Sequence, residues 1–252
     1  MAKATSKATS KKTEPKSGKW LTVAYSPVSL FSLKRSDATS MAARASLVPT
    51  PYAIKMALLK VMLENQGAKH TADFDAWIKQ EFAWIRDLEI RVSPPDRVLV
   101  NRNGYKLRYY DQTADKADKN RPTMPLTDGF VFREWVHLEG KLTLCCGVTD
   151  RIDDLEALFS QLNYFGKRGC FFQYLPDGKI VTNEARFSAD PMNSFVIQPM
   201  DDLGEKATFE AVSPFSEKKM GKNDRIVRSG FLPLQLTATS ARYDLYTRYL
   251  DS

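Results

Sequence analysis

The stretch VPTPYAIKMALL, residues 48–59, predicts the N-terminus of a buried helix. Thr50 can cap this helix, because its hydroxyl accepts a backbone N–H that the first turn leaves unpaired, and Pro51 suits the first helical position. Apolar residues then continue to Leu63 around most of the helix circumference. We therefore expect a largely buried helix, in which Lys55 is the one cation near the capped end.

Strand and helix patterns alternate on both sides of this stretch. Residues 20–25 are a short β-rich run, and a basic segment without clear periodicity connects them to Val48. The further expected elements are a helix over 71–85, a strand over 88–92, a strand pair over 130–144, a helix over 152–164 and a strand over 170–175. With a hairpin inserted before the third strand, this order is typical of an α+β, ferredoxin-like (RRM-like) β-α-β-β-α-β domain over about residues 20–180. Residues 181–252 are expected to form a small β-rich C-terminal part, with strands near 195–198, 207–212 and 226–236.

An inserted hairpin is predicted within residues 96–129. Asn103-Gly104 lies between the β-rich runs 98–102 and 105–110, and Asn-Gly in that position is a strong signal for a tight hairpin turn. Cations and aromatic residues alternate along these runs, a pattern that suits phosphate contacts combined with base stacking. They include Arg102, Tyr105, Lys106, Arg108 and Tyr109. A solvated edge hairpin that carries charges for solubility is the alternative interpretation.

A second candidate site is the loop Gly166-Lys167-Arg168-Gly169, directly after the helix predicted over 152–164. Two glycines let a backbone come close to a phosphate, and two adjacent cations neutralise its charge. Gly166 is also explained as a simple helix stop, but that explanation leaves the two cations and Gly169 unaccounted for.

Charge is concentrated at the N-terminus. Residues 1–19 contain six lysines and only Glu14, so they carry +5 of the formal net charge of +7, and we expect a disordered basic tail. The chain has no apolar run long enough for a membrane span and no secretory leader, so we expect a cytoplasmic protein without a membrane partner. The three cysteines have no C-x-x-C spacing, which argues against a disulfide framework and a structural zinc site.

Signals for catalysis are weak. The only histidines are His70, in a polar turn, and His137, on a strand with alternate polar and aromatic residues. That strand face either binds RNA or faces solvent, and we favour solvent. Neither a phosphate-binding G-x-x-x-x-G-K-[ST] loop nor a paired-histidine motif is present, so we expect no catalytic residue, metal or cofactor.

Two of these segments carry a family resemblance. Thr50, Pro51, Ile54, Lys55, Leu58 and Leu59 match a T-P-x-x-[IL]-[KR]-x-x-[LI]-[LM]-like helix start, and residues 165–171 match a glycine-containing loop before a late strand. On these residues the chain resembles the "Cas five" group of CRISPR-associated proteins, a branch of the RAMP superfamily. The resemblance covers about residues 20–180.

The resemblance implies a subunit of a type I Cascade-type surveillance complex, which acts in RNA-guided DNA targeting. Such a subunit caps the foot of the complex by binding the 5′ handle of CRISPR RNA. Its partners would be the backbone RAMP subunits, the large subunit and target DNA near the foot, and the inserted hairpin would be its thumb. The RNA-binding residues expected on this basis are Lys34, Arg35, Lys55, Arg102, Tyr105, Lys106, Arg108, Tyr109, Gly166, Lys167, Arg168 and Gly169. Lys34 and Arg35 are included by position alone.

Two alternatives remain open. Some relatives cut precursor CRISPR RNA with a tyrosine, a histidine and a lysine, without a metal, but we match no such trio here. The chain is therefore expected not to be an enzyme, with endoribonuclease as the second hypothesis. The third hypothesis is a generic single-stranded RNA-binding module without a role in an assembly.

Overall fold

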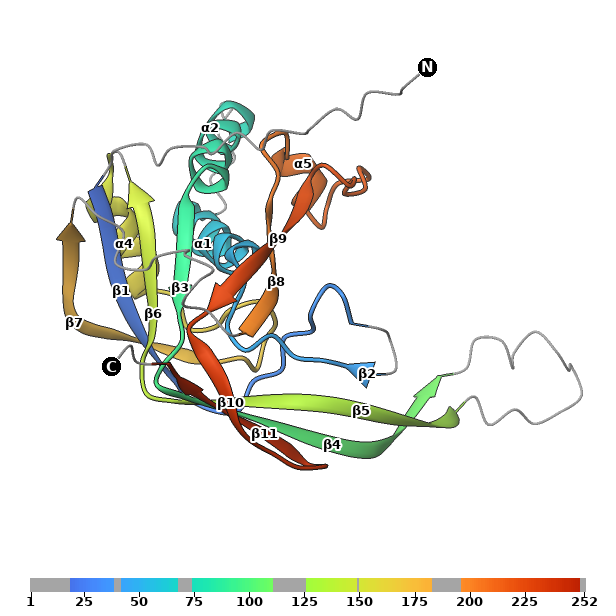
Figure 1. Cartoon of the computed structure of the whole chain (residues 1–252). Coiled ribbons are helices and arrows are strands. Elements are labelled where there is room, and N and C mark those ends of the chain that lie inside the picture. The colour runs from blue at the N-terminus through green and yellow to red at the C-terminus, as the bar shows by residue number, and fades with distance from the viewer. Residues whose placement is uncertain are drawn as a thin grey trace, which may run out of the picture.

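The computed structural model describes six stretches of the chain: residues 19–38, 42–67, 74–110, 126–148, 150–182 and 196–249 (Figure 1). The basic tail before residue 19, His70 and the segment 111–125 lie outside the described residues. The strands are β1 (Lys19–Pro27), β2 (Ala42–Ala43), β3 (Glu89–Ser93), β4 (Arg97–Tyr110), β5 (Leu126–Glu139), β6 (Leu142–Val148), β7 (Phe172–Thr182), β8 (Val196–Leu203), β9 (Arg225–Leu232), β10 (Leu234–Thr239) and β11 (Tyr243–Arg248). The helices are α1 (Pro51–Gln66), α2 (Phe74–Arg86), α4 (Ile152–Ser160) and the short α5 (Phe209–Val212).

A four-stranded antiparallel sheet forms the centre of the molecule, in the order β3-β6-β1-β7. Helices α1 and α4 lie behind this sheet in the view of Figure 1. Strand β1 is central, and its residues Leu21, Val23 and Tyr25 belong to the core together with residues of α1. The predicted α+β class is confirmed, with mostly antiparallel sheets and few helices.

Helix α1 forms as its sequence predicts. The Thr50 hydroxyl accepts a hydrogen bond from the Ala53 backbone N–H at 3.3 Å, and Pro51 occupies the first helical position. The helix ends at Gly67, whose φ of 64° is a conformation that glycine adopts without strain. Ile54, Ala57 and Leu59 are buried and point in different directions around the helix axis, so the helix is held by packing on several sides.

The predicted turn at Asn103-Gly104 is wrong. These residues lie inside the continuous strand β4, which pairs with β5 from Arg97 opposite Glu139 to Tyr110 opposite Leu126. Gly104 serves close packing here, because a Cβ atom at this position would lie 2.7 Å from a ring carbon of Phe130. The local turn signal is therefore overridden by pairing with a second strand of equal length.

Strands β4 and β5 form an arm that extends away from the central sheet (Figure 1). The arm is inserted between β3 and β6, which are neighbours in the central sheet, and it is the middle of a second sheet ordered β10-β11-β4-β5-β2. Strand β11 therefore pairs with β4 of the arm, and β10 pairs with β11. Helix α5 replaces the strand expected over 207–212, because Phe209 packs on Phe82 of α2 and Ala211 is buried beside it.

Strands β8 and β9 form a two-stranded ribbon that packs on α1. Gln198 of β8 connects the ribbon to the segment before α1. Its side-chain oxygen accepts a hydrogen bond from the Leu47 N–H, and its amide donates one to the Val48 carbonyl. The ribbon thus fixes the segment just before α1. Within the described ranges, no helix has both the length and the apolar character that crossing a membrane requires.

Candidate nucleic-acid interface

The loop Gly166–Gly169, called the glycine loop below, is a tight turn with two cations at its tip. Its ends are tied by backbone hydrogen bonds from Phe165 N–H to the Cys170 carbonyl and from Cys170 N–H to the Lys167 carbonyl, both at 3.2 Å. Gly166 and Gly169 have φ angles of 73° and 94°, which favour glycine strongly. Lys167 and Arg168 are both exposed, so their charges are accessible to a ligand.

Three segments that are distant in sequence meet at this loop. A Cβ atom on Gly166 would lie 2.6 Å from a methyl group of Leu33 and 3.8 Å from the Cβ of Ala53. The glycine loop therefore packs against the segment after β1 and against the first turn of α1. That turn carries the positive end of the helix dipole, and Lys34 and Arg35 directly follow Leu33. The two position-based candidates are thus next in the chain to a residue that contacts the loop.

Lys34 and Arg35 differ in availability. Lys34 is exposed, and its backbone pairs with Ala45. The Arg35 guanidinium contacts the Asp37 carboxylate at 2.7 Å, and this hydrogen bond lowers the pKa of Asp37. Part of the Arg35 charge is therefore neutralised within the protein, so Lys34 is the more accessible cation of the two.

Buried aromatic rings support the glycine loop from below. Phe165 is fully buried, with its ring centroid 5.0 Å from that of Tyr25 and 5.1 Å from that of Phe172. The Tyr25 hydroxyl donates a hydrogen bond to the Phe159 carbonyl at 2.6 Å, and burial raises the pKa of Tyr25 well above its ordinary value. These contacts hold the base of the loop rigid and leave its tip in solvent.

Lys55 is not part of the exposed surface, contrary to the expectation. Its side chain is 2% exposed, and its Nζ donates to the Arg86 carbonyl at 2.8 Å and lies 2.6 Å from the Asp202 carboxylate. Burial lowers the pKa of Lys55, and the nearby Asp202 opposes this shift. Asp202 comes from β8, so the ribbon covers the helix face that carries Lys55 and removes it from contact with RNA.

The arm candidates fall into two groups. The Arg102 guanidinium is engaged by contacts within the protein. It pairs with Asp244 of β11, lies 3.5 Å from Glu134 and donates to the Ser240 carbonyl. Lys106 is exposed, and Arg108 is 74% exposed although it lies 3.2 Å from Asp128. The side chain of Tyr109 lies outside the described residues.

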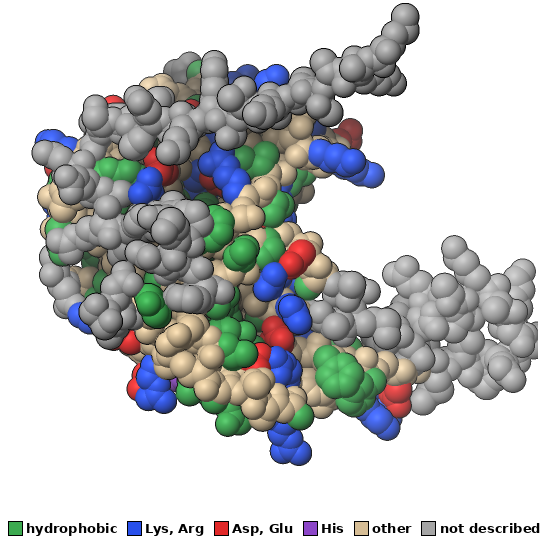
Figure 2. All heavy atoms as spheres, in the orientation of Figure 1, with side chains coloured by type: hydrophobic (Ala, Val, Ile, Leu, Met, Phe, Trp, Pro, Cys, Tyr) green, Lys and Arg blue, Asp and Glu red, His purple; other side chains and the backbone are tan. Residues whose placement is uncertain are grey.

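The exposed aromatic pair Phe130 and Phe132 is not among the residues predicted from the sequence. Each ring is 56% exposed, and their centroids are 4.9 Å apart. Lys106 is directly opposite Phe130 in the strand pair, so the two share one face of the arm, whereas Tyr105 is on the other face. The alternation of Phe130 and Phe132 was a usable signal once the partner strand was known. Figure 2 shows hydrophobic and charged side chains together on the arm, and a hollow between the arm and the end of the molecule that carries α5 and β9.

His137 lies on β5 opposite Leu99 and is exposed. Across the six described stretches, no group of three histidine, cysteine or carboxylate residues is arranged to hold a metal ion.

Comparison with known proteins identifies a relative. No protein-family model matches the sequence. The CRISPR-associated protein Cas5 of Archaeoglobus fulgidus is 24% identical over 214 residues, which cover 81% of this chain and 88% of that protein. A solved structure described as a CRISPR protein from Archaeoglobus fulgidus aligns over 92% of this chain and 93% of its own, with a TM-score of 0.39 and 11% identity. The sequence relationship confirms the family resemblance: over most of its length the chain is similar to a CRISPR-associated protein Cas5.

Proposed function

We propose that this protein binds CRISPR RNA and caps its 5′ handle in a type I Cascade-type surveillance complex, next to a backbone RAMP subunit. The observation that carries the proposal is the glycine loop, with two exposed cations at its tip and its base packed against Leu33 and the first turn of α1. The relationship to a CRISPR-associated protein supports the CRISPR part of the proposal. The large subunit and target DNA near the foot would be further partners.

The chemistry of this interface suits single-stranded RNA. Lys167, Arg168 and Lys34 supply cations for phosphates, and glycine backbone allows close approach of a nucleotide. On the arm, which we propose as the thumb, the Phe130–Phe132 pair beside Lys106 supplies a surface for unstacked bases. Arg102 and Lys55 are left out of this set because both are committed to internal ion pairs.

A ferredoxin-like β-α-β-β-α-β unit is part of the proposal. In support of it, the four central strands follow one another along the chain as β1, β3, β6 and β7 and lie in the order β3-β6-β1-β7. Helices follow the first and the third of these strands.

The double variant Lys167→Ala, Arg168→Ala tests the proposal. If both side chains contact phosphates, the slope of log affinity against log salt concentration should fall by about 1.4, or about 0.7 for each contact. Fluorescence anisotropy with a labelled single-stranded RNA at several salt concentrations measures this slope. The matched control is Lys218→Ala, Lys219→Ala, which removes the same charge from an exposed segment between α5 and β9. Equal slopes for the wild type and the Lys167, Arg168 variant would refute the assignment.

The partner part of the proposal has its own test. Expression with the neighbouring genes, purification by a tag and sequencing of the bound RNA should recover discrete RNAs that share one 5′ end, together with backbone subunits. Heterogeneous RNA without other subunits would instead support the generic RNA-binding module.

The proposed role is binding without cleavage. We therefore expect His137→Ala to leave both handle binding and the 5′ end of the bound RNA unchanged. Incubation of a labelled precursor RNA with each protein, followed by gel analysis, measures this. Cleavage by the wild type that His137→Ala abolishes, with RNA affinity intact, would establish an endoribonuclease.

A further inference from the structure

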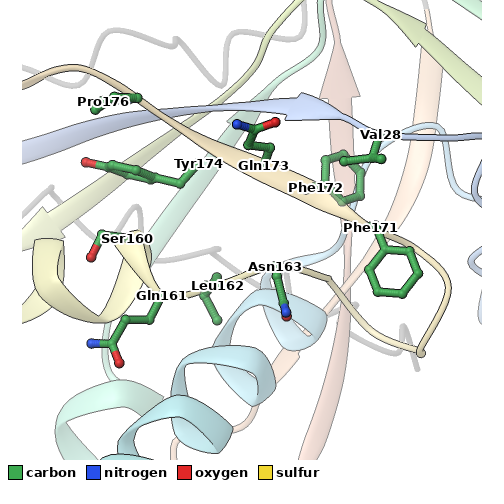
Figure 3. A pocket seen from close by; sticks show the side chains of 10 residues that line it. All are labelled: Val28, Ser160, Gln161, Leu162, Asn163, Phe171, Phe172, Gln173, Tyr174 and Pro176. Atoms are coloured by element: carbon green, nitrogen blue, oxygen red, sulfur yellow. The ribbon is translucent and has the colours of Figure 1, made fainter.

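A pocket of about 610 Å³ opens beside the glycine loop, on the outer edge of β7 (Figure 3). Strand β7 is the last strand of the central sheet, so no described strand pairs with this edge. The pocket lies between β7 and the segment that follows α4. Its lining residues are Val28, Ser160, Gln161, Leu162, Asn163, Phe171, Phe172, Gln173, Tyr174 and Pro176.

Two of the side chains that line the pocket are accessible to a ligand. The Phe171 ring is 44% exposed, although most large apolar side chains nearby belong to the core. The Asn163 side chain is exposed, and among the described residues its amide has no hydrogen-bond partner. By contrast, the Gln161 amide already donates to the Ala157 carbonyl at 2.9 Å. Figure 3 shows Phe171 and Asn163 extending to the same side of β7.

The same two residues form the base of the glycine loop. Phe171 pairs with Tyr164 across the loop, and the Phe172 N–H donates to the Asn163 carbonyl at 3.0 Å. A phosphate held at Lys167 and Arg168 would therefore place the attached nucleoside near Phe171. The ring offers a stacking surface, and the amide offers one donor and one acceptor side by side.

We propose that this pocket holds one unstacked nucleobase of the RNA, stacked on Phe171 and hydrogen-bonded by the Asn163 amide. The Watson–Crick edge of each RNA base carries a hydrogen-bond donor beside an acceptor, so the asparagine amide can form two hydrogen bonds with any of the four bases. The pocket therefore binds a base without selecting its identity. This inference rests on the proposed RNA-binding function and adds a base-binding pocket beside the glycine loop.

Anisotropy titrations of the full chain with labelled eight-residue oligomers of A, C and U test base binding in the pocket. The variant Phe171→Leu should bind all three oligomers about 5- to 100-fold more weakly, because it removes the stacking surface but no charge. Its salt slope should equal that of the wild type. The variant Asn163→Leu should bind all three oligomers more weakly by about fivefold or more, with an unchanged salt slope, because it removes hydrogen bonds to the base but no charge. Phe215→Leu, at a 96% exposed ring outside the pocket, is the matched control.

The outcomes separate this inference from the proposed function. If Lys167→Ala, Arg168→Ala weakens RNA binding but Phe171→Leu does not, the phosphate site is supported and the base pocket is refuted. Unchanged affinity of Asn163→Leu for all three oligomers refutes the hydrogen bonds from the Asn163 amide. Absence of RNA binding by the wild type, or a salt slope unaffected by the loop variant, refutes the function itself. Thermal unfolding of each variant confirms that the fold is retained.

Discussion

Replacing Lys55 with methionine is expected to lower the free energy of unfolding by about 3 kcal/mol, which is more than a hundredfold in the folding equilibrium. The ammonium group is 2% exposed and is held by the Asp202 carboxylate and the Arg86 carbonyl. Methionine fills the same space but leaves Asp202 of β8 without its counter-charge where the ribbon packs on α1. Removing one partner of a buried ion pair is costly because the remaining charge stays desolvated. Chemical denaturation followed by circular dichroism measures the change.

Two companion variants show whether the buried charge is the cause. Lys60→Met removes a lysine from the same helix at a partly exposed position, where its ion pair with Glu64 is worth about 0.5 kcal/mol or less. Adding Asp202→Leu to Lys55→Met removes both charges and should restore most of the lost stability. Equal effects of Lys55→Met and Lys60→Met would contradict the structure. RNA affinity measured on folded Lys55→Met should match the wild type, because Lys55 does not reach the surface.

The N-terminal cap of α1 could be predicted from the sequence, whereas the burial of Lys55 within the same helix could not. The capping residues at Thr50 and Pro51 act within one helical turn, so residues 50–53 contain all the information needed for the N-terminus of α1. The burial of Lys55 depends on β8, which lies about 150 residues away in the chain. A lysine near the N-terminus of an apolar helix is equally compatible with binding a phosphate or pairing with a distant carboxylate.

In the arm, too, the local sequence predicts only part of the structure, and pairing with a distant strand decides the rest. The residue types of β4 predict an extended conformation correctly, but Asn103-Gly104 has the composition of a tight turn. Only the register with β5 shows that Gly104 accommodates the ring of Phe130. That register also separates Tyr105 from the face that holds Lys106, and it reveals the aromatic pair that the sequence pattern alone did not distinguish.

Replacing Gly166 with valine is expected to have the largest effect on the glycine loop. At a φ of 73° a β-branched residue is strained by about 1–2 kcal/mol, and its Cβ would lie 2.6 Å from a Leu33 methyl group. The loop would therefore move away from Leu33 and carry Lys167 and Arg168 with it. We expect RNA affinity to fall at least tenfold, and the salt slope to decrease as in the double variant Lys167→Ala, Arg168→Ala.

Gly169→Val is the matched control for this effect. Gly169 has an equally unusual φ of 94°, but a Cβ atom there would meet nothing within 4 Å. It therefore reports backbone strain without the clash, and the excess effect of Gly166→Val measures the contact with Leu33. If that contact positions the loop, Leu33→Ala should restore RNA affinity and the salt slope in the Gly166→Val background, with a coupling free energy above about 0.5 kcal/mol. Equal losses in both glycine variants, without rescue by Leu33→Ala, would mean that Leu33 does not position the loop. The glycine loop would then act alone, and Lys34 and Arg35 would lose their only structural link to it.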